Sequence, residues 1–325
     1  MSSSTSGNAG CPDVGTLPFA VPEDKPGRPR TPENRYGPVA GITPFSVLRS
    51  ELGPWVNHRR TWKAYGLGGA SGREDVKLYK LPANFGNSGY GVAPSVFDPV
   101  LAEADYLWYC PPGGAILDPF AGGAVRGLVA GNGGFRYTGV DLSPEQVAVN
   151  RDTADDWRAR GLLAADPDWI TGDSADVLPE LPDGAFDHVF TCPPYHSLER
   201  YSDDPADLSA MSWEAFADVY GRIIGESVRC LAEDRFSTWV VGNIRDSAGM
   251  IRDLAALTTA AHERAGARLY NDAILLNTIG TTAMRLPPQW KASRKMGRIH
   301  QYVLTFVKGD PRKATRAIDG GDHEA

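Results

Sequence analysis

Hydrophobic residues between positions 92 and 310 form short apolar runs that alternate with longer amphipathic stretches. Short apolar runs are typical of strands buried in a parallel sheet, and amphipathic stretches are typical of helices that cover it. The runs predict seven strands, at 115–117, 137–140, 169–171, 188–191, 237–241, 273–276 and 302–307. The amphipathic stretches predict helices at 99–109, 123–131, 144–160, 213–231 and 248–265. The expected fold is α/β, a doubly wound, seven-stranded, mostly parallel sheet with helices on both faces.

The segments outside this region differ from it in composition. Residues 1–44 carry eight prolines with glycine and serine, and they lack apolar periodicity, which predicts a disordered tail. Residues 45–91 join aromatic and basic side chains to a glycine-rich stretch, which predicts a small basic element and a loop. We therefore expect one main domain over 92–310 and a C-terminal tail over 311–325.

The overall composition narrows the class of protein. With 42% hydrophobic and 22% charged residues, the chain of 325 residues is typical of a folded globular protein. Its four cysteines form no CxxC pair and its six histidines show no metal-ligand spacing, so we expect no metal, no disulfide framework and a reducing cytoplasm. No apolar run approaches the roughly 18 residues of a membrane helix, and the N-terminus lacks the features of a signal peptide.

Basic residues are concentrated in one part of an acidic chain. The formal net charge is −7, yet residues 285–316 hold nine Lys or Arg against one acid. Cations interleaved with an aromatic ring suit phosphate neutralisation and base stacking, whereas a basic surface hairpin without a ligand is the alternative. The candidate nucleic-acid contacts are Arg285, Trp290, Lys291, Arg294, Lys295 and Arg298, with Arg59 and Arg60 in the N-terminal element.

Polar and glycine residues follow the first three predicted strands. The sequence DPFAGG occupies 118–123, Asp141 ends the second strand, and Gly172-Asp173-Ser174 ends the third. Glycines let a backbone approach a ligand closely, and an acid about 20 residues further on can accept hydrogen bonds from a ribose. No GxxxxGK[ST] is present and Asp118 would repel a pyrophosphate, which favours a nucleoside without phosphates, such as S-adenosylmethionine. A tight strand-to-helix turn, and helix capping by Asp173, are the structural alternatives.

The fourth predicted strand ends in Cys192-Pro193-Pro194-Tyr195. Two consecutive prolines remove two backbone donors and fix a stiff turn whose carbonyls face away from the sheet. A base amine could donate to these carbonyls while Tyr195 stacks on the ring, whereas a simple strand terminator is the structural alternative.

Together, DPFAGG at 118–123, VDL at 140–142, GDS at 172–174 and CPPY at 192–195 resemble the motif series of the S-adenosylmethionine-dependent DNA amino-methyltransferases, the N6-adenine and N4-cytosine enzymes. The resemblance covers about 92–310 and includes the upstream stretch from Ser95 to Pro99. It implies a Rossmann-like methyltransferase fold, S-adenosylmethionine as cofactor, and methyl transfer to the exocyclic amine of a flipped-out base. DNA is the implied partner, with RNA not excluded.

The resemblance also implies which residues form the site. The cofactor residues would be Ser95, Phe97, Asp118, Pro119, Phe120, Ala121, Gly122, Gly123, Asp141, Leu142, Asp173 and Ser174. The catalytic residues would be Cys192, Pro193, Pro194 and Tyr195.

The chain departs from the family pattern at two positions. The glycine turn usually reads DPFxGSG or DPFxGTG, and here Gly123-Ala124 ends it. The catalytic tetrapeptide normally begins with Asp, Asn or Ser, whereas Cys192 offers a thiol, which is a weak acceptor. Two alternatives therefore stay open. Cys192 could be the nucleophile of a pyrimidine C5 methyltransferase, or the domain could bind S-adenosylmethionine and nucleic acid without turnover.

Overall fold

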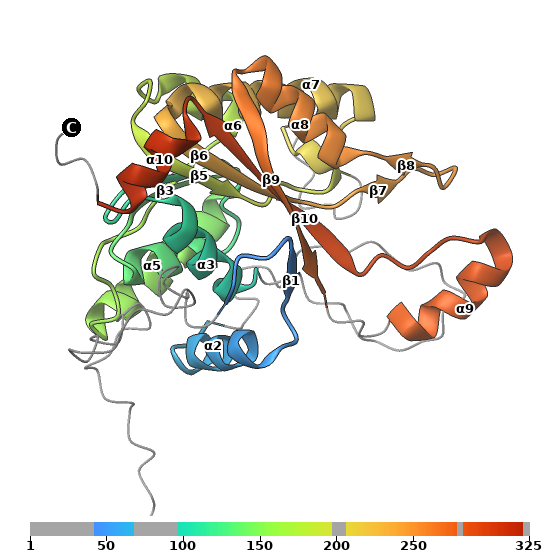
Figure 1. Ribbon diagram of the computed structural model, residues 1–325, viewed down its shortest axis with the longest axis horizontal. Helices are drawn as coiled ribbons and strands as arrows, with labels where there is room; N and C mark the ends of the chain where they lie inside the picture. The colour runs from blue at the N-terminus through green and yellow to red at the C-terminus, as the bar shows by residue number, and fades with distance from the viewer. Residues whose placement is uncertain (1–41, 68–96, 197–205, 278–281, 321–325) are drawn as a thin grey trace, which may run out of the picture.

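An eight-stranded sheet forms the centre of the protein (Figure 1). The computed structural model describes residues 42–67, 97–196, 206–277 and 282–320. The strand order is β1-β9-β10-β6-β5-β2-β3-β4. The strands are β1 (Val47–Arg49), β2 (Ala115–Asp118), β3 (Arg136–Asp141), β4 (Asp168–Thr171), β5 (Phe186–Thr191), β6 (Leu231–Val241), β9 (Ala267–Leu276) and β10 (His300–Lys308). All seven predicted strands are confirmed, and β1 adds an eighth.

The direction of the strands indicates at which edge of the sheet a ligand site should lie. Only the pairs made by β10, with β6 and with β9, are antiparallel, and the other pairs of this sheet are parallel. The carboxyl ends of β2, β3, β4, β5, β6 and β9 therefore lie on one edge of the sheet. Ligands of open α/β sheets bind at this edge.

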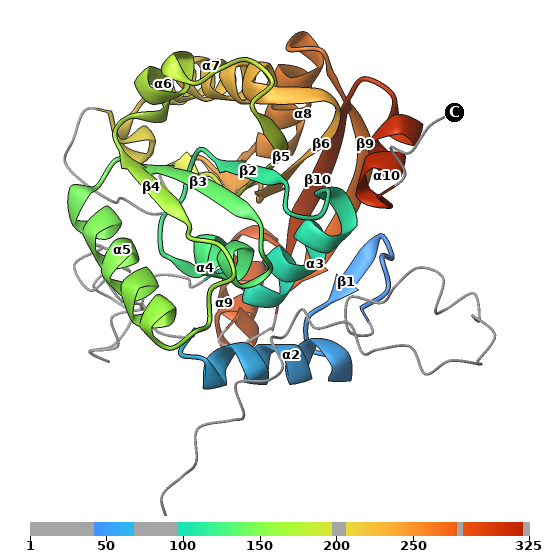
Figure 2. The same cartoon turned by 90° about the vertical axis from the view of Figure 1, so that its left-hand side faces the viewer.

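Helices cover both faces of the sheet (Figure 2). One face carries α2 (Gly53–Ala64), α3 (Pro99–Tyr109), α4 (Val125–Asn132) and α5 (Pro144–Ala159). The other carries α6 (Ser174–Val177), α7 (Trp213–Cys230) and α8 (Leu254–Arg264), with the short 3-10 turns η1 (Leu178–Glu180) and η3 (Leu208–Ala210). Each face has its own buried apolar cluster, which confirms the predicted two-layer covering of the sheet.

The predicted helix starts agree with the structure where the chain supplies a capping side chain followed by proline. Asp98 accepts a hydrogen bond from the amide of Val100 at the start of α3. Ser143 accepts one from the amide of Gln146 at the start of α5. In both helices the next residue is a proline, whose fixed φ suits the first helical position.

The N-terminal element packs into the core of the main domain, although the sequence placed it outside. The indole of Trp62 in α2 is fully buried, donates to the Glu103 carboxylate at 2.7 Å and stacks on Trp157 of α5. The Trp55 indole donates to Asp98 at 2.8 Å. Residues 47–49 pair in parallel with β9. The segment 42–67 therefore extends the sheet and covers one of its faces.

Residues 311–318, which we expected to belong to a tail, form helix α10 (Pro311–Ile318). Asp310 caps this helix by accepting from the Arg312 amide at 2.7 Å. Ala314 is buried against Phe236 and Val307. The last helix therefore packs on the end of the sheet.

The helix predicted at 248–265 begins six residues later than expected. The residues before it form a hairpin of β7 (Ile244–Arg245) and β8 (Ile251–Arg252), and α8 begins after Asp253, which caps it. Gly249 adopts φ +87°, a conformation that interrupts a helix. The basic stretch forms helix α9 (Thr282–Ser293), which the sequence did not predict because Pro287 and Pro288 lie inside it.

No helix within the described ranges is long and apolar enough to cross a membrane. Among the same residues, no group of three or more His, Cys, Asp or Glu side chains could hold a metal ion.

A buried histidine gives the fold a testable pH dependence. The His262 ring of α8 is fully buried, stacks on Phe306 with centroids 3.7 Å apart and donates from Nδ1 to the Thr258 carbonyl at 2.9 Å. Burial lowers its pKa to about 3. The unfolded chain, with an ordinary histidine pKa near about 6.5, takes up this proton first, so stability is full above that pH and falls as the pH drops toward 3.

We expect the free energy of unfolding of the wild type to fall by about 2 kcal/mol more than that of His262→Phe between pH 7 and pH 5. Phenylalanine keeps the stack on Phe306 and cannot be protonated. Urea unfolding of both proteins at the two pH values measures the difference. Equal pH dependence would contradict the assignment.

Candidate active site

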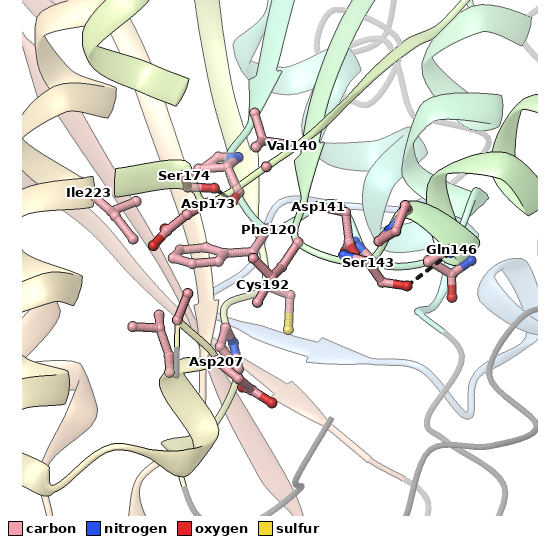
Figure 3. Close-up of a pocket in the computed structure, with 18 of the residues that line it drawn as sticks. Phe120, Val140, Asp141, Ser143, Gln146, Asp173, Ser174, Cys192, Asp207 and Ile223 are labelled. Atoms are coloured by element: carbon pink, nitrogen blue, oxygen red, sulfur yellow. Dashed lines mark hydrogen bonds between the residues drawn. The ribbon is translucent and has the colours of Figure 1, made fainter. Parts of the chain in front are cut away.

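A pocket of about 440 Å³ opens at the carboxyl ends of the central strands (Figure 3). This volume lies in the range of small-molecule sites. Its walls are Pro119, Phe120, Gly122, Val140, Asp141, Leu142, Ser143, Pro144, Glu145, Gln146, Gly172, Asp173, Ser174, Cys192, Pro194, Ala206, Asp207, Leu208 and Ile223. The glycine turn after β2 and the proline corner after β5 therefore open onto one cavity, as the predicted chemistry requires.

Most of the predicted cofactor residues line this pocket. They are Pro119, Phe120, Gly122, Asp141, Leu142, Asp173 and Ser174, joined by Cys192 and Pro194 of the proline corner. Phe97, Asp118, Ala121, Gly123, Pro193 and Tyr195 do not line it. Ser95 lies outside the described residues.

Asp118 lies beneath the pocket instead of in its wall. Its side chain is fully buried and accepts hydrogen bonds from Arg126 Nε at 2.6 Å, the Tyr137 hydroxyl at 2.7 Å and the Thr191 hydroxyl at 2.6 Å. Burial alone would lower the pKa of the Arg126 guanidinium. The negative charge of Asp118 and its hydrogen bond act in the opposite direction, and the pKa is raised above its ordinary value. Asp118 therefore positions the turn and does not line the pocket, and its predicted role toward the cofactor stays a prediction.

Phe97 also has a packing role. Its ring lies edge-on to Phe190 of β5, and the Arg126 guanidinium sits 4.7 Å from its centroid. The ring thus covers the buried ion pair beneath the glycine turn.

Asp141 connects the glycine turn to the start of α5. One carboxylate oxygen accepts from the Gly122 amide at 2.7 Å, and the other accepts from the Ser143 amide at 2.9 Å. Gly122 has φ +53°, and Ala121 packs so closely on Gly139 that a Cβ at 139 would lie 2.8 Å from the Ala121 Cβ. Because each carboxylate oxygen can accept two hydrogen bonds, Asp141 can also bind a ribose hydroxyl from the pocket wall.

Asp173 and Ser174, which follow β4, form a further part of the pocket wall. Asp173 accepts from the Ala175 amide at 2.8 Å, so it caps α6 as the structural alternative proposed, while it also lines the cavity. The Ser174 hydroxyl donates to the Pro119 carbonyl and so joins the ends of β4 and β2.

The proline corner is anchored to the neighbouring strands through Tyr195. The Cys192 sulfur lies 3.4 Å from the Tyr195 hydroxyl, which accepts a hydrogen bond from Gln301 Nε2 at 2.9 Å. The Tyr195 ring also packs beside Gly242, where an added Cβ would meet it at 3.8 Å. The Cys192 side chain is partly exposed and faces the same cavity as Phe120 and Asp207 (Figure 3).

Sequence reasoning missed ten lining residues, namely Val140, Ser143, Pro144, Glu145, Gln146, Gly172, Ala206, Asp207, Leu208 and Ile223. Those directly before or after a predicted strand end could have been found, because they share the ligand edge. Ile223, from the middle of α7, carries no signal that distinguishes it from an ordinary core residue.

The predicted nucleic-acid contacts fall in two places. Trp290, Lys291, Arg294 and Arg298 are exposed on or after α9, which also contains Arg285, and Lys295 is partly exposed. The Arg294 guanidinium lies 5.5 Å from the Trp290 ring centroid. On α2, Arg59 forms an ion pair with Asp98 that supports the start of α3, and Arg60 is exposed. Arg59 therefore has a structural role in addition to any role in binding.

Residues 120–211 match the family model described as a methyltransferase domain. The matched segment is less than a third of the chain. This match, together with the sheet topology, confirms the expected Rossmann-like methyltransferase fold and S-adenosylmethionine as the cofactor. The matched segment contains the pocket residues from Phe120 to Leu208.

Individual relatives are similar over part of their length. The Type II methyltransferase M.TthHB8I of Thermus thermophilus is 28% identical over 154 residues, which cover 43% of this chain and 31% of the relative. The structure of TrmN from Thermus thermophilus is 17% identical with a TM-score of 0.43 and covers 67% of this chain and 51% of TrmN. A SAM-dependent methyltransferase from Methanosarcina mazei is 15% identical with a TM-score of 0.42, over 62% and 95% of the two chains. This chain thus spans about a third of the curated relative and about half of TrmN.

Replacing Asp141 by Asn should weaken cofactor binding by tenfold or more. The amide has one acceptor atom for two backbone donors and carries no charge, and a hydrogen bond to a charged group is worth roughly 1.5–3 kcal/mol. Isothermal titration with S-adenosylmethionine measures the effect. Asp152→Asn, the same change at an exposed residue of α5 that does not line the pocket, is the matched control, and thermal unfolding verifies that both variants fold. Unchanged affinity in Asp141→Asn would refute the role.

Proposed function

We propose that this protein transfers a methyl group from S-adenosylmethionine to an exocyclic amine of a nucleic-acid base, cytosine N4 or adenine N6 in DNA. The observation that carries the proposal is that Cys192 and Pro194 line the same cavity as Gly122 and Asp141. A proline-stiffened corner and a nucleoside-binding turn in one pocket suit transfer between two nucleoside-like ligands.

In the proposed mechanism the target base is flipped out of the stack, because its amine cannot otherwise reach the pocket. The Pro193 carbonyl accepts a hydrogen bond from the amine and Cys192 lies beside it, so the nitrogen lone pair is drawn out of conjugation. The bound cofactor supplies the methyl group on its sulfonium. With the cofactor bound, methyl transfer to the nitrogen would release S-adenosylhomocysteine, and the methylated amine would lose its extra proton to water. Orientation of the lone pair carries the catalysis, and no covalent enzyme intermediate forms.

Tyr195 is proposed to hold the flipped base by stacking, a contact worth roughly 1–3 kcal/mol. Its hydroxyl is fixed by Gln301 of β10 and its ring packs beside Gly242 at the end of β6. A ring held from two strands loses little conformational freedom when a base stacks on it.

DNA is the proposed substrate for two reasons. The stretch 282–300 has five Lys or Arg and no acid, which favours a polyanion. The partial relative M.TthHB8I is by its name a Type II methyltransferase. We call residues 282–300 the basic arm. RNA stays an alternative, because the basic arm would neutralise the phosphates of either nucleic acid.

Mass spectrometry of nucleosides tests the target atom. DNA is incubated with the protein and S-adenosylmethionine that carries a labelled methyl group, and wild type is compared with Cys192→Ser. We expect label on an exocyclic nitrogen and retained activity in Cys192→Ser, since serine occupies this position in related tetrapeptides. Label on a ring carbon with abolished activity in the variant would establish Cys192 as a nucleophile. Cofactor binding without transfer to DNA or RNA would favour a non-catalytic binding protein.

A further inference from the structure

The hairpin of β7 and β8 is a short, well-fixed projection that the proposed mechanism does not use. Two residue pairs join its strands, Ile244 with Arg252 and Arg245 with Ile251. Asp246 closes the turn, because its carboxylate accepts from the Met250 amide at 2.8 Å and its amide donates to the Met250 carbonyl at 3.0 Å. The Arg245 guanidinium donates to the Gly249 carbonyl at 2.7 Å. This density of hydrogen bonds in a few residues makes the turn rigid.

The tip of this hairpin presents apolar side chains to solvent. Met250 is 64% exposed and Ile251 is 53% exposed. Arginines 245 and 252 flank them. Adjacent exposed apolar side chains mark an interaction site, and flanking cations indicate that its partner is an anion with apolar surfaces.

The base of the hairpin is attached to the proline corner. Gly242, two residues before β7, packs beside the Tyr195 ring. Arg252 of β8 lies over the Trp213 ring, with the guanidinium carbon 5.0 Å from the centroid, and Trp213 is edge-on to His196, the residue that follows Tyr195. The position of the tip is therefore set relative to the proposed base-binding residues.

The basic arm that contains α9 meets the hairpin. An added Cβ on Gly249 would lie 2.5 Å from Lys295 Nζ, so the lysine packs directly on the hairpin turn. The hairpin follows the carboxyl end of β6 and the arm follows the carboxyl end of β9, which is the edge that holds the pocket. Figure 1 shows β7, β8 and α9 projecting on the same side of the sheet.

We propose that Met250 and Ile251 form a wedge that enters the base stack of a duplex beside the target base, while the cations of the arm and hairpin neutralise the backbone. The inference rests on the proposed function and specifies its substrate as double-stranded. Apolar side chains inserted between base steps unstack them and offset part of the cost of extrusion. A single strand needs no such wedge, because its bases are already accessible.

The test compares three substrates that share one target strand: a matched duplex, the same duplex with a mismatch at the target base, and the single strand alone. The Met250→Ala/Ile251→Ala double variant should lose at least about tenfold in methylation rate on the matched duplex, which corresponds to 1.4 kcal/mol. On the mismatched duplex and the single strand it should stay within about twofold of the wild type, since a mismatched base costs less to extrude.

Leu269→Ala is the matched control, because Leu269 is an exposed apolar residue on the half of β9 remote from the pocket edge. It should leave all three rates unchanged, and titration with S-adenosylmethionine should show equal affinity in both variants. Equal losses on all three substrates, or no loss on the matched duplex, would overturn the wedge while leaving the proposed function intact. A wild type that methylates none of the three overturns the proposed function, and the wedge with it.

Discussion

The geometry of the site depends on the hydrogen bonds that the buried carboxylate of Asp118 accepts. A buried charge is tolerated only when it is paired and hydrogen-bonded, and Asp118 meets this condition through Arg126 of α4, Tyr137 of β3 and Thr191 of β5. Arg126 in turn donates to the carbonyls of Phe120 and Ala121. One carboxylate therefore fixes the glycine turn and also the strand end that leads directly into Cys192. The cofactor wall and the proline corner keep their relative positions because both are bonded to the same buried group.

Around this centre the edge of the sheet divides into two halves, one that forms the pocket and one beyond it. The turns after β2, β3 and β4 are joined by hydrogen bonds: the Gly122 amide donates to Asp141, and the Ser174 hydroxyl donates to the Pro119 carbonyl. The connections after β6 and β9 instead leave the sheet as the hairpin and the basic arm. Tyr195 lies between the two halves, since it follows β5 in the chain but is held by Gly242 and Gln301. A change in the hairpin or the basic arm can thus leave the hydrogen bonds of the pocket wall in place.

The sequence predicts those features that are set locally. Buried strands read as apolar runs, and helix starts such as Ser143-Pro144 combine a cap with a proline, so their positions could be found without tertiary information. β1 could not, because it has only three residues, two of them exposed, and pairs with β9 more than 200 residues away. The sequence shows that the basic arm is rich in cations but does not predict its helix. Pro287 and Pro288 lie inside this helix, and proline is unfavourable in a helix interior. That Asp118 is buried behind the pocket wall could not be predicted either, because strand-end position alone does not show which way a carboxylate faces.

The surroundings of Cys192 bear on which chemistry its thiol supports. A nucleophilic cysteine needs a nearby positive charge to stabilise its thiolate. Arg126 interacts electrostatically with Cys192, and this guanidinium forms an ion pair with Asp118 at 2.6 Å. The Cys192 sulfur also lies 3.4 Å from the hydroxyl of Tyr195, whose position is set by Gln301. In the proposed mechanism the Cys192 side chain fills space beside the target amine next to an oriented aromatic residue, and the Pro193 carbonyl would accept the hydrogen bond of the amine.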